Sequence, residues 1–437
     1  MSTFENLMTG FQNGKALAAA APSVEFRAAE QHTFDEKRQS GNAIACGDNL
    51  AYMAWLLRNG YAGKVKCVYI DPPFFTKAKY SAVVDLRDAD GHKHKVKHLA
   101  YDDTFERDLE HYVTNITARL ILIRELLADD GLIWMHLDWH SSHYIRIIMD
   151  EVFGTKNFIN EIVWKYKSGG SGKRHFSRKH DSILLYAKTP AYRLRIPQEK
   201  SYNRGLKPYK FKGVKEYKDD YGWYTMVNMK DVWSIDMVGR TSRERTGYAT
   251  QKPLELMKRI VESSTDEGDL CADFFCGSGS FLDACDTLGR RWIGCDSEEM
   301  AVGMTKRRLD SIKATYTYYL STNDNHYHDG LTMRMLSSEE LESGKRMYRY
   351  TVDSFTPDID YGHIPLNDRA VVERIATDNP TSLIECIMID PDTQDAFTCG
   401  MTVEGCPEEI LFLSHGDAAF VAVDAFGKEY YYSSRQQ

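Results

Sequence analysis

Short apolar runs alternate with longer segments of helical period between Gly41 and about Leu309. Residues 65–70 (VKCVYI) have the composition of a buried strand, and residues 109–127 carry apolar side chains at the spacing of an amphipathic helix. Alternating strands and helices form parallel sheets, because each crossover helix packs back onto the sheet. The pattern therefore predicts an α/β fold with a mostly parallel sheet.

The same patterning places further elements along the chain. We expect strands at residues 132–137, 160–166, 181–188, 270–274 and 292–295, and helices at 140–153, from 253, after 279 and ending near 309. The glycine- and serine-rich residues 168–172 are expected to form a flexible loop. The changes in pattern divide the chain into a lead-in with little periodicity at 1–40, α/β blocks at 41–189 and 246–325, an insertion at 190–245 and a small C-terminal α+β appendage at 326–437.

A basic segment stands out from an otherwise acidic chain. The formal net charge of the whole chain is −8, yet residues 156–259 hold 24 Lys and Arg against 10 Asp and Glu. Aromatic residues are interleaved with these cations at Tyr192, Tyr202, Tyr209, Tyr217, Tyr221, Trp223 and Tyr224. Such a segment can bind a polyanion such as nucleic acid, whereas a solvated surface loop is the simpler alternative.

Composition excludes several classes of protein. No run approaches the roughly 20 apolar residues that span a bilayer, and the first residues lack the pattern of a signal peptide. The nine cysteines are scattered without a Cys-x-x-Cys pair, so neither a zinc site nor a disulfide framework is indicated. We therefore expect a cytoplasmic protein with no membrane partner.

The motif Asp71-Pro72-Pro73-Phe74 directly follows the strand predicted at residues 65–70. Ligands bind at the carboxyl ends of strands in open α/β sheets, and two prolines make the loop rigid. The Asp71 carboxylate and the Pro72 carbonyl can accept hydrogen bonds from an amino group, while Phe74 offers a face on which a base can stack. The motif indicates a pocket for a planar amine; the alternative is an acidic residue before a simple Pro-Pro turn.

A second motif, Asp273-Phe274-Phe275-Cys276-Gly277-Ser278-Gly279-Ser280, leads from a predicted strand into a helix. Gly277 and Gly279 permit a tight turn and close approach of the backbone to a ligand. Asp296 ends the next predicted strand, where an acid can accept hydrogen bonds from the ribose of an adenosine-containing cofactor. A third spaced glycine and a Gly-Lys-Ser/Thr element are missing, which argues against NAD and nucleoside triphosphates.

Taken in this order, Asp-Pro-Pro-Phe and Phe-x-Gly-x-Gly resemble motifs IV and I of the β class of DNA adenine-N6/cytosine-N4 methyltransferases, which includes the modification subunits of type III restriction systems. The likeness covers roughly residues 42–310, with Gly47-Asp48-Asn49-Leu50 and Thr250-Gln251-Lys252-Pro253 in support. It implies a Rossmann-like fold with a mostly parallel seven-stranded sheet. It also implies S-adenosylmethionine as cofactor and direct methyl transfer to the amine of a flipped base, with adenine N6 as the expected target.

The resemblance assigns residues to roles. Catalysis and base binding fall to Asp71, Pro72, Pro73 and Phe74. The cofactor-binding set is Asp48, Asp71, Thr250, Lys252, Asp273, Phe275, Gly277, Gly279 and Asp296. In the basic segment we expect Lys165, Lys167, Lys173, Arg174, Arg178 and Lys179 to contact DNA. Residues 41–189 then form the catalytic half, 246–325 the cofactor half, and 190–245 the target-recognition region.

Both motifs depart from the usual pattern of this family. Phe74 stands where tyrosine is usual, and Phe274 and Cys276 stand where proline and a small residue are usual. Phenylalanine still stacks and cysteine is small, so we expect both roles to be kept. One group of residues has side chains of the kinds that bind metals: His136, Asp138, His140 and His143. No metal site is expected there, because methyl transfer from a sulfonium needs no metal.

The sequence also leaves other functions open. A cytosine-N4 methyltransferase shares the machinery, although such enzymes more often have serine in place of Asp71. An RNA methyltransferase is less favoured, because those enzymes commonly place the glycine-rich element first. A non-catalytic DNA-binding subunit could keep the fold, but the intact Asp71 and Gly277-x-Gly279 argue against it. Double-stranded DNA is the expected partner, and a homodimer and a restriction subunit are left open.

Overall fold

The α/β alternation is present in the computed structural model, which describes residues 2–34, 41–103, 108–167, 172–239, 241–248, 250–322, 327–341, 343–393 and 397–436. Most of the glycine- and serine-rich stretch, residues 168–171, lies outside them. Within the described residues eleven strands form one central sheet. In order across the sheet they are β12 (Val232–Ser234), β7 (Phe158–Lys165), β8 (His180–Ala187), β6 (Leu127–Leu137), β3 (Val65–Ile70), β13 (Leu270–Asp273), β14 (Arg291–Asp296), β2 (Ala43–Cys46), β15 (Tyr316–Ser321), β1 (Phe26–His32) and β20 (Phe397–Cys399).

Most neighbouring strands of this sheet run parallel. Parallel pairings join β6, β3, β13, β14, β2 and β15, whereas β8 pairs antiparallel with both β6 and β7. The predicted Rossmann-like fold with a mostly parallel sheet is therefore confirmed, but seven strands were too few. The sheet is larger because β12 extends one edge and β15, β1 and β20 extend the other, which covers edges that would otherwise be unpaired.

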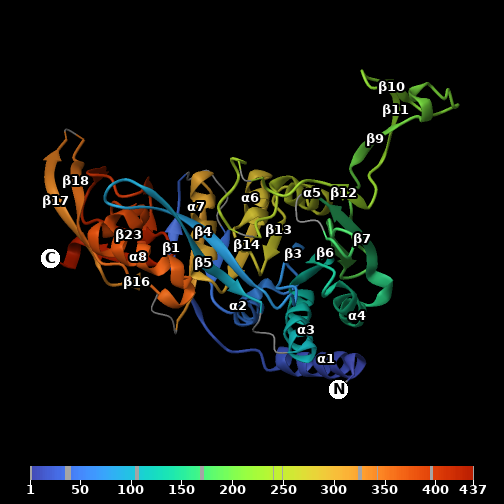
Figure 1. Cartoon of the computed structure of the whole chain (residues 1–437), viewed down its shortest axis with the longest axis horizontal. Coiled ribbons are helices and arrows are strands. Elements are labelled where there is room, and N and C mark those ends of the chain that lie inside the picture. The colour runs from blue at the N-terminus through green and yellow to red at the C-terminus, as the bar shows by residue number, and fades with distance from the viewer. Residues whose placement is uncertain are drawn as a thin grey trace.

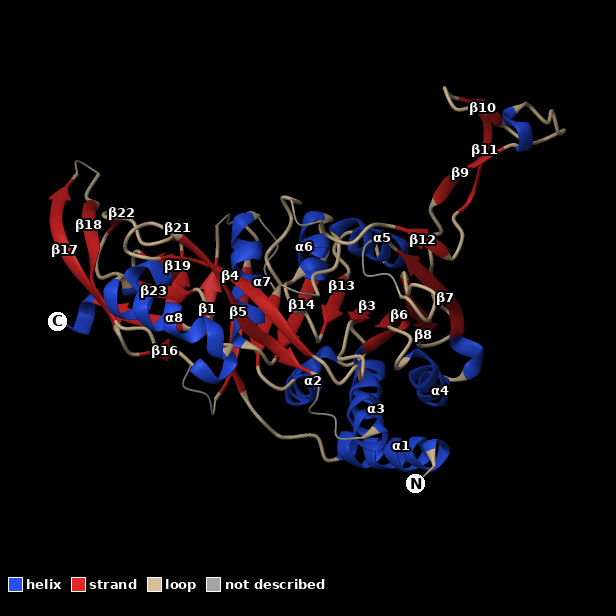
Figure 2. Ribbon diagram, in the orientation of Figure 1, coloured by secondary structure: helices blue, strands red, loops and turns tan. Residues whose placement is uncertain are grey.

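Helices cover both faces of the central sheet (Figure 1, Figure 2). One face carries α2 (Asn49–Leu56), α3 (Leu109–Leu126) and α4 (Ser142–Phe153), and the other carries α5 (Leu254–Ser264), α6 (Ser280–Thr287) and α7 (Glu299–Ser311). Alternate residues of β3 serve the two faces, since Val68 and Ile70 pack with the first group and Cys67 and Tyr69 with the second. Among the described helices, none combines the length and apolar character that a membrane crossing requires.

The lead-in is more ordered than its sequence indicated. Helix α1 (Thr3–Ala19) begins with a capping box between Ser2 and Glu5 and packs on α3. It packs through small residues rather than an apolar stripe: a Cβ at Gly14 would lie 2.5 Å from the Cβ of Thr117. Because small residues make this contact, the sequence of α1 shows only a weak apolar periodicity. Strand β1 follows and pairs with β15 and β20, so part of the lead-in belongs to the central sheet.

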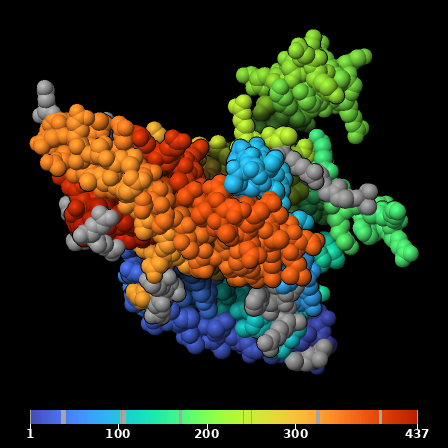
Figure 3. Space-filling view, turned by 60° about the vertical axis from the view of Figure 1, so that its left-hand side comes forward, coloured from blue at the N-terminus to red at the C-terminus, as the bar shows by residue number. Residues whose placement is uncertain are grey.

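The C-terminal region, from residue 327 onward, is α+β as expected but shares a core with the rest of the molecule. Its elements are β16 (Tyr327–His328), β17 (Leu331–Glu340), β18 (Arg346–Phe355), α8 (Leu366–Asp378), β19 (Ile384–Asp390), β21 (Met401–Glu404), β22 (Ile410–Ser414), β23 (Ala419–Asp424) and β24 (Glu429–Ser433). A hairpin that no motif had indicated, β4 (Lys79–Arg87) and β5 (Lys93–Asp102), packs Leu86 and Val96 into the same core as Ile384 and Phe420. In Figure 3 this region, orange to red, extends from the upper left across the front of the molecule.

Part of the insertion projects from the body as an arm, residues 198–228. Strands β9 (Gln198–Tyr202), β10 (Glu216–Lys218) and β11 (Trp223–Asn228) form a separate three-stranded sheet that stands off the molecule (Figure 1, Figure 3). Its tyrosines pack on one another, since Tyr202 and Tyr217 each lie 5.6 Å from Tyr224 between ring centroids. Because β12 joins the central sheet, the part that stands apart is narrower than residues 190–245.

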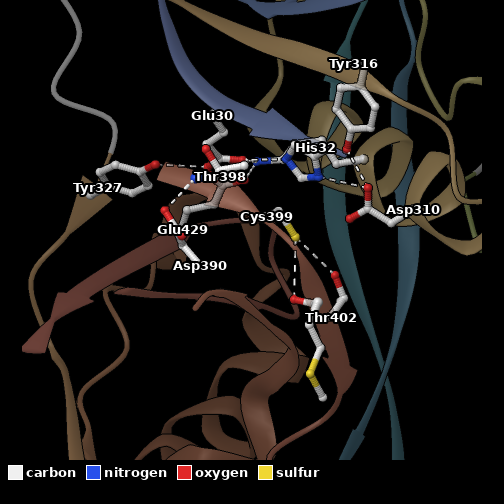
Figure 4. A network of polar contacts seen from close by, with 12 residues as sticks. Glu30, His32, Asp310, Tyr316, Tyr327, Asp390, Thr398, Cys399, Thr402 and Glu429 are labelled. Carbon is white, nitrogen blue, oxygen red and sulfur yellow. Dashed lines mark hydrogen bonds and ion pairs between the residues drawn. The ribbon is translucent and has the colours of Figure 1, made fainter. Parts of the chain in front are cut away.

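A buried group of charged side chains, which we call the junction cluster, joins the C-terminal region to the central sheet (Figure 4). Lys306 donates to Glu30 at 2.5 Å and to Glu429 at 2.6 Å, and none of the three side chains is more than 2% exposed. His32 lies 2.9 Å from Glu30 and 3.0 Å from Asp310. Burial acts to lower the pKa of His32 and of Lys306, but the facing carboxylates outweigh burial and raise both pKa values above their usual range.

Candidate active site

Acidic residues lie at the carboxyl ends of neighbouring strands: Asp71 follows β3, Asp273 ends β13, Asp296 ends β14 and Asp48 follows β2. These strands are parallel, so their ends meet at one edge, where the four acids line a cavity of about 1000 Å³. The same cavity is lined by the predicted residues Pro72, Pro73, Phe74, Thr250, Lys252, Phe275 and Gly277. In the described part of the chain Gly279 is not among the lining residues; it precedes α6 instead.

Asp71 pairs one carboxylate oxygen with a cation and leaves the other without a donor. The Lys252 ammonium donates to Oδ2, and the two side chains are 11% and 15% exposed. Oδ1 is buried and has no hydrogen-bond partner among the described residues. A buried acceptor left in this state costs about 1–3 kcal/mol, so it is expected where a ligand supplies the donor. Lys252, predicted among the cofactor residues, thus contacts the predicted catalytic carboxylate.

His136 on β6 lies behind Asp71. The histidine is fully buried; its Nδ1 lies 3.7 Å from Asp71 Oδ1 and 2.8 Å from the Tyr69 hydroxyl, and its Nε2 lies 3.3 Å from Asp181 Oδ2. Burial acts to raise the pKa of Asp181, but His136 outweighs it and lowers this pKa below its usual value. Sequence reasoning had weighed His136 only as a metal ligand. The signal for its position was a histidine inside an otherwise apolar strand.

The Asp-Pro-Pro-Phe loop is held in place by α3. The Tyr112 hydroxyl donates to the Pro73 carbonyl at 3.0 Å, and Phe75 stacks on Tyr112 with 5.2 Å between ring centroids. Phe74 lies 5.7 Å from the His136 ring, and the Lys252 ammonium lies 5.7 Å from the Phe74 ring centre. A rigid loop with an aromatic face beside an acceptor can fix both the plane and the amino group of a base.

The glycine turn and Asp296 hold one another in position. The Gly277 amide donates to Asp296 Oδ2 at 2.8 Å, and the Glu298 amide donates to Oδ1 at 3.1 Å. Gly277 has φ +51°, and a Cβ there would lie 3.3 Å from the Tyr248 ring. Burial raises the pKa of Asp296, and burial together with Asp296 raises the pKa of Glu298 to about 7. The anchored carboxylate keeps lone pairs that can accept further hydrogen bonds.

The two remaining acids are tied to local backbone. Asp273 Oδ1 accepts the Phe275 amide at 3.0 Å, and burial raises the pKa of Asp273 well above its usual value. Asp48 accepts the Leu50 amide at 3.0 Å as the cap of α2, and Arg119 donates to it at 3.0 Å. Several cavity residues lie outside the recognised motifs, and the sequence did not indicate them: Tyr101, Arg119, Tyr248, Glu298 and His363.

The predicted DNA-binding residues lie at the end of β7 and on its connection to β8, at the same edge of the sheet as Asp71. They are Lys165, Lys167, Lys173, Arg174, Arg178 and Lys179. The Arg178 guanidinium lies 3.7 Å above the ring of Trp139, which follows the end of β6, and Lys167 Nζ lies 3.3 Å from Asp236. We call residues 172–179 the basic loop. The structure thus brings these cations to the edge of the sheet at which the cavity lies.

Comparison with known proteins places this site in a family. The type II methyltransferase M.EcaI of Enterobacter cloacae is 28% identical in an alignment of 344 residues that covers 65% of this chain and 73% of that protein. The Mod subunit of the type III restriction-modification enzyme EcoP15I of Escherichia coli is 28% identical over 35% of this chain and 25% of its own length. Among solved structures, that of the M1.HpyAVI–SAM complex is 18% identical, covers 62% of this chain and all of its own, and has a TM-score of 0.40.

The family model for a DNA methylase, N6_N4_Mtase, matches residues 65–307, which are more than half of the chain. The matched region begins at β3 and ends within α7, so it contains Asp71, Lys252, the glycine turn and Asp296. From this match and the cavity that these residues form, we conclude that the chain belongs to the family of N6/N4 DNA methylases.

Proposed function

We propose that this protein transfers a methyl group from S-adenosylmethionine to N6 of adenine in double-stranded DNA, at a base flipped out of the helix. The observation that carries the proposal is Asp71 Oδ1, a buried acceptor without a partner among the described residues. It lies in a cavity of about 1000 Å³, at the upper end of the sizes typical of small-molecule sites. A cofactor and one base can share this volume.

The residues at the other end of the cavity fit S-adenosylmethionine. Asp296 can accept hydrogen bonds from ribose hydroxyls while its amide bonds hold it in place, and the Gly277 backbone lies beside it. The wall also carries carboxyl groups of Asp48, Asp273 and Glu298, which suit a cationic sulfonium better than a phosphate. When bound, this cofactor supplies an electrophilic methyl group.

The protein's own residues prepare the amine. Stacking on Phe74, worth about 1–3 kcal/mol, offsets part of the few kcal/mol needed to extrude the base. Asp71 Oδ1 and the Pro72 carbonyl accept the two amino hydrogens, which orients the nitrogen lone pair toward the methyl group and stabilises the positive charge that develops. Lys252 occupies Oδ2 and leaves Oδ1 for the amine. The amine then gives up one proton to Asp71 or to water.

DNA binding is proposed for the basic loop and the arm. The basic loop lies at the same edge of the sheet as the cavity, and the arm presents lysines and exposed aromatic side chains such as Tyr221 and Phe211 away from the body. Contacts of these cations with phosphates should make affinity fall steeply with salt, by about 0.9 in log K per phosphate neutralised. Binding of a second copy of this chain or of a restriction subunit stays a prediction.

The proposal is tested by incubating the protein with DNA and isotope-labelled S-adenosylmethionine, digesting the DNA and identifying the methylated nucleoside by mass spectrometry. Labelled N6-methyladenine is expected. N4-methylcytosine would overturn the choice of adenine, and no incorporation at all would favour a DNA-binding subunit without catalysis. The Asp71→Ala variant serves as the control for contaminating activity.

A further inference from the structure

Phe176 is the most exposed large hydrophobic side chain among the described residues, with 97% of its surface open to solvent. Single exposed apolar residues are common and need no explanation by themselves. This ring, however, lies in the basic loop, between Arg174 and Arg178, and belongs to none of the apolar clusters that the described residues form. Packing of the fold therefore does not explain the position of the Phe176 ring.

The basic loop is rooted beside the predicted catalytic carboxylate. At its end the Tyr166 amide donates to the Lys179 carbonyl at 3.0 Å, which closes the connection between β7 and β8. Two residues later Asp181 contacts His136, whose Nδ1 lies 3.7 Å from Asp71 Oδ1. Arg178 covers the ring of Trp139, just beyond the end of β6. Phe176 thus leaves the body at the edge of the sheet where a flipped base would enter.

The charge around Phe176 fits duplex DNA. The basic loop, GKRHFSRK, contains two lysines and two arginines and no acidic residue. Such side chains bind the phosphates of both strands and place the protein on the helix without reading the bases. When these cations bind phosphates, an apolar ring among them comes close to the stacked bases. Proteins that deform DNA insert phenylalanine or leucine between stacked bases as wedges.

Building on the proposed function, we propose that Phe176 inserts into the base stack of the duplex and fills the space that the flipped base leaves. An extruded base leaves its partner unpaired and both neighbours with one open face. A ring stacked in that gap regains part of the lost stacking and prevents the base from returning. Phe74 then stacks on the flipped base inside the cavity, while Phe176 occupies the gap that this base leaves in the duplex.

The test compares two duplexes in single-turnover methyl transfer by the full-length protein, after methylation-aware sequencing has given its recognition sequence. One duplex is fully paired, and the other carries an abasic site opposite the target base, so that this base is already unpaired. Phe176→Ala should slow methylation of the paired duplex by on the order of tenfold or more. It should have much less effect on the opened duplex, and Phe176→Trp should restore the rate.

Phe4→Ala is the matched control, because Phe4 is 72% exposed and lies on α1, outside the proposed DNA surface. It should leave both rates unchanged. Fluorescence of 2-aminopurine at the target position should rise on binding the wild type and rise less with Phe176→Ala. An equal loss on both duplexes, or no loss on either, would overturn the role of Phe176. If the wild-type protein methylated neither duplex, the proposed function itself would fail.

Discussion

The junction cluster and the active site both bury acidic and basic side chains, but they differ in what is left unpaired. In the junction cluster Lys306 meets two carboxylates, and His32 lies between Glu30 and Asp310. In the active site Lys252 meets one oxygen of Asp71, and the other oxygen has no hydrogen-bond partner among the described residues.

The difference follows from what each group of residues does. The junction cluster lies between α7 and the strands β1 and β24, and its charges neutralise one another in a sealed interior. The active site lines an open cavity, where an unpaired acceptor costs stability in the free protein and is satisfied when a ligand binds. Substitutions should therefore cost mainly stability in the first group and mainly activity in the second.

The largest effect is expected when the junction cluster loses its central cation. Lys306→Met removes the cation that lies between the buried carboxylates of Glu30 and Glu429, which should lower the free energy of unfolding by about 3–5 kcal/mol in denaturant titrations. Adding Glu30→Gln and Glu429→Gln should recover most of this loss, because a buried ion group replaced as a whole is nearly neutral. A loss of less than about 1 kcal/mol in the single variant would show that the cluster is solvated like a surface pair.

The opposite pattern is expected at Asp71. Asp71→Ala should slow methyl transfer by about 10²–10³ in single-turnover assays, because it removes a preorganised acceptor that faces the developing charge. Calorimetry should find S-adenosylmethionine affinity nearly unchanged, and the free energy of unfolding should change less than in the Lys306 variant. Asp71→Asn keeps an acceptor oxygen and should retain more activity than alanine. A rate within tenfold of the wild type would refute the assignment of Asp71.

Asp296 should separate cofactor binding from chemistry within the active site. Asp296→Ala removes an anchored carboxylate, and the loss of charge-assisted hydrogen bonds of about 1.5–3 kcal/mol should weaken S-adenosylmethionine binding on the order of 10–100-fold. Saturating cofactor should restore much of the rate. An unchanged dissociation constant in calorimetry would mean that Asp296 only supports the turn at Gly277 and Glu298.

Neither group of buried charges reaches the arm, so exchanging the arm should leave stability and chemistry intact. We expect a chimera that carries the corresponding segment of a related enzyme to methylate a different sequence at a similar rate. Each altered base contact is worth about 1–3 kcal/mol of discrimination. Methylation-aware sequencing of DNA exposed to the chimera measures this. An active chimera with the original sequence preference would move recognition to the C-terminal region.

The smallest effect is a pH dependence of the junction cluster. The pKa of His32 is raised on folding, so protonation of His32 stabilises the folded state. That contribution is fully present below the unfolded pKa of about 6.5 and is lost as pH rises through the folded pKa. The difference in unfolding free energy between wild type and His32→Asn should therefore shrink as pH rises. A constant difference would show that His32 stays neutral in the folded protein.

The sequence by itself determined those features of this protein that depend on residues close together in the chain. The runs at β3, β13 and β14 have the apolar composition of buried strands, and each is followed or ended by the acid that lines the cavity. Motif and strand are contiguous, and parallel strands end at one edge, so the position of Asp71, Gly277 and Asp296 could be inferred without coordinates.

Only the tertiary structure decided which distant residues meet. Lys252 could be placed near the site but not on Asp71, and the junction cluster joins residues as far apart as Glu30 and Glu429. The C-terminal region was expected to stand apart, yet it shares a core with the hairpin of β4 and β5. Periodicity reports whether a face is buried but not what buries it, and a charged residue is stable in the interior only when the fold brings its partner to it.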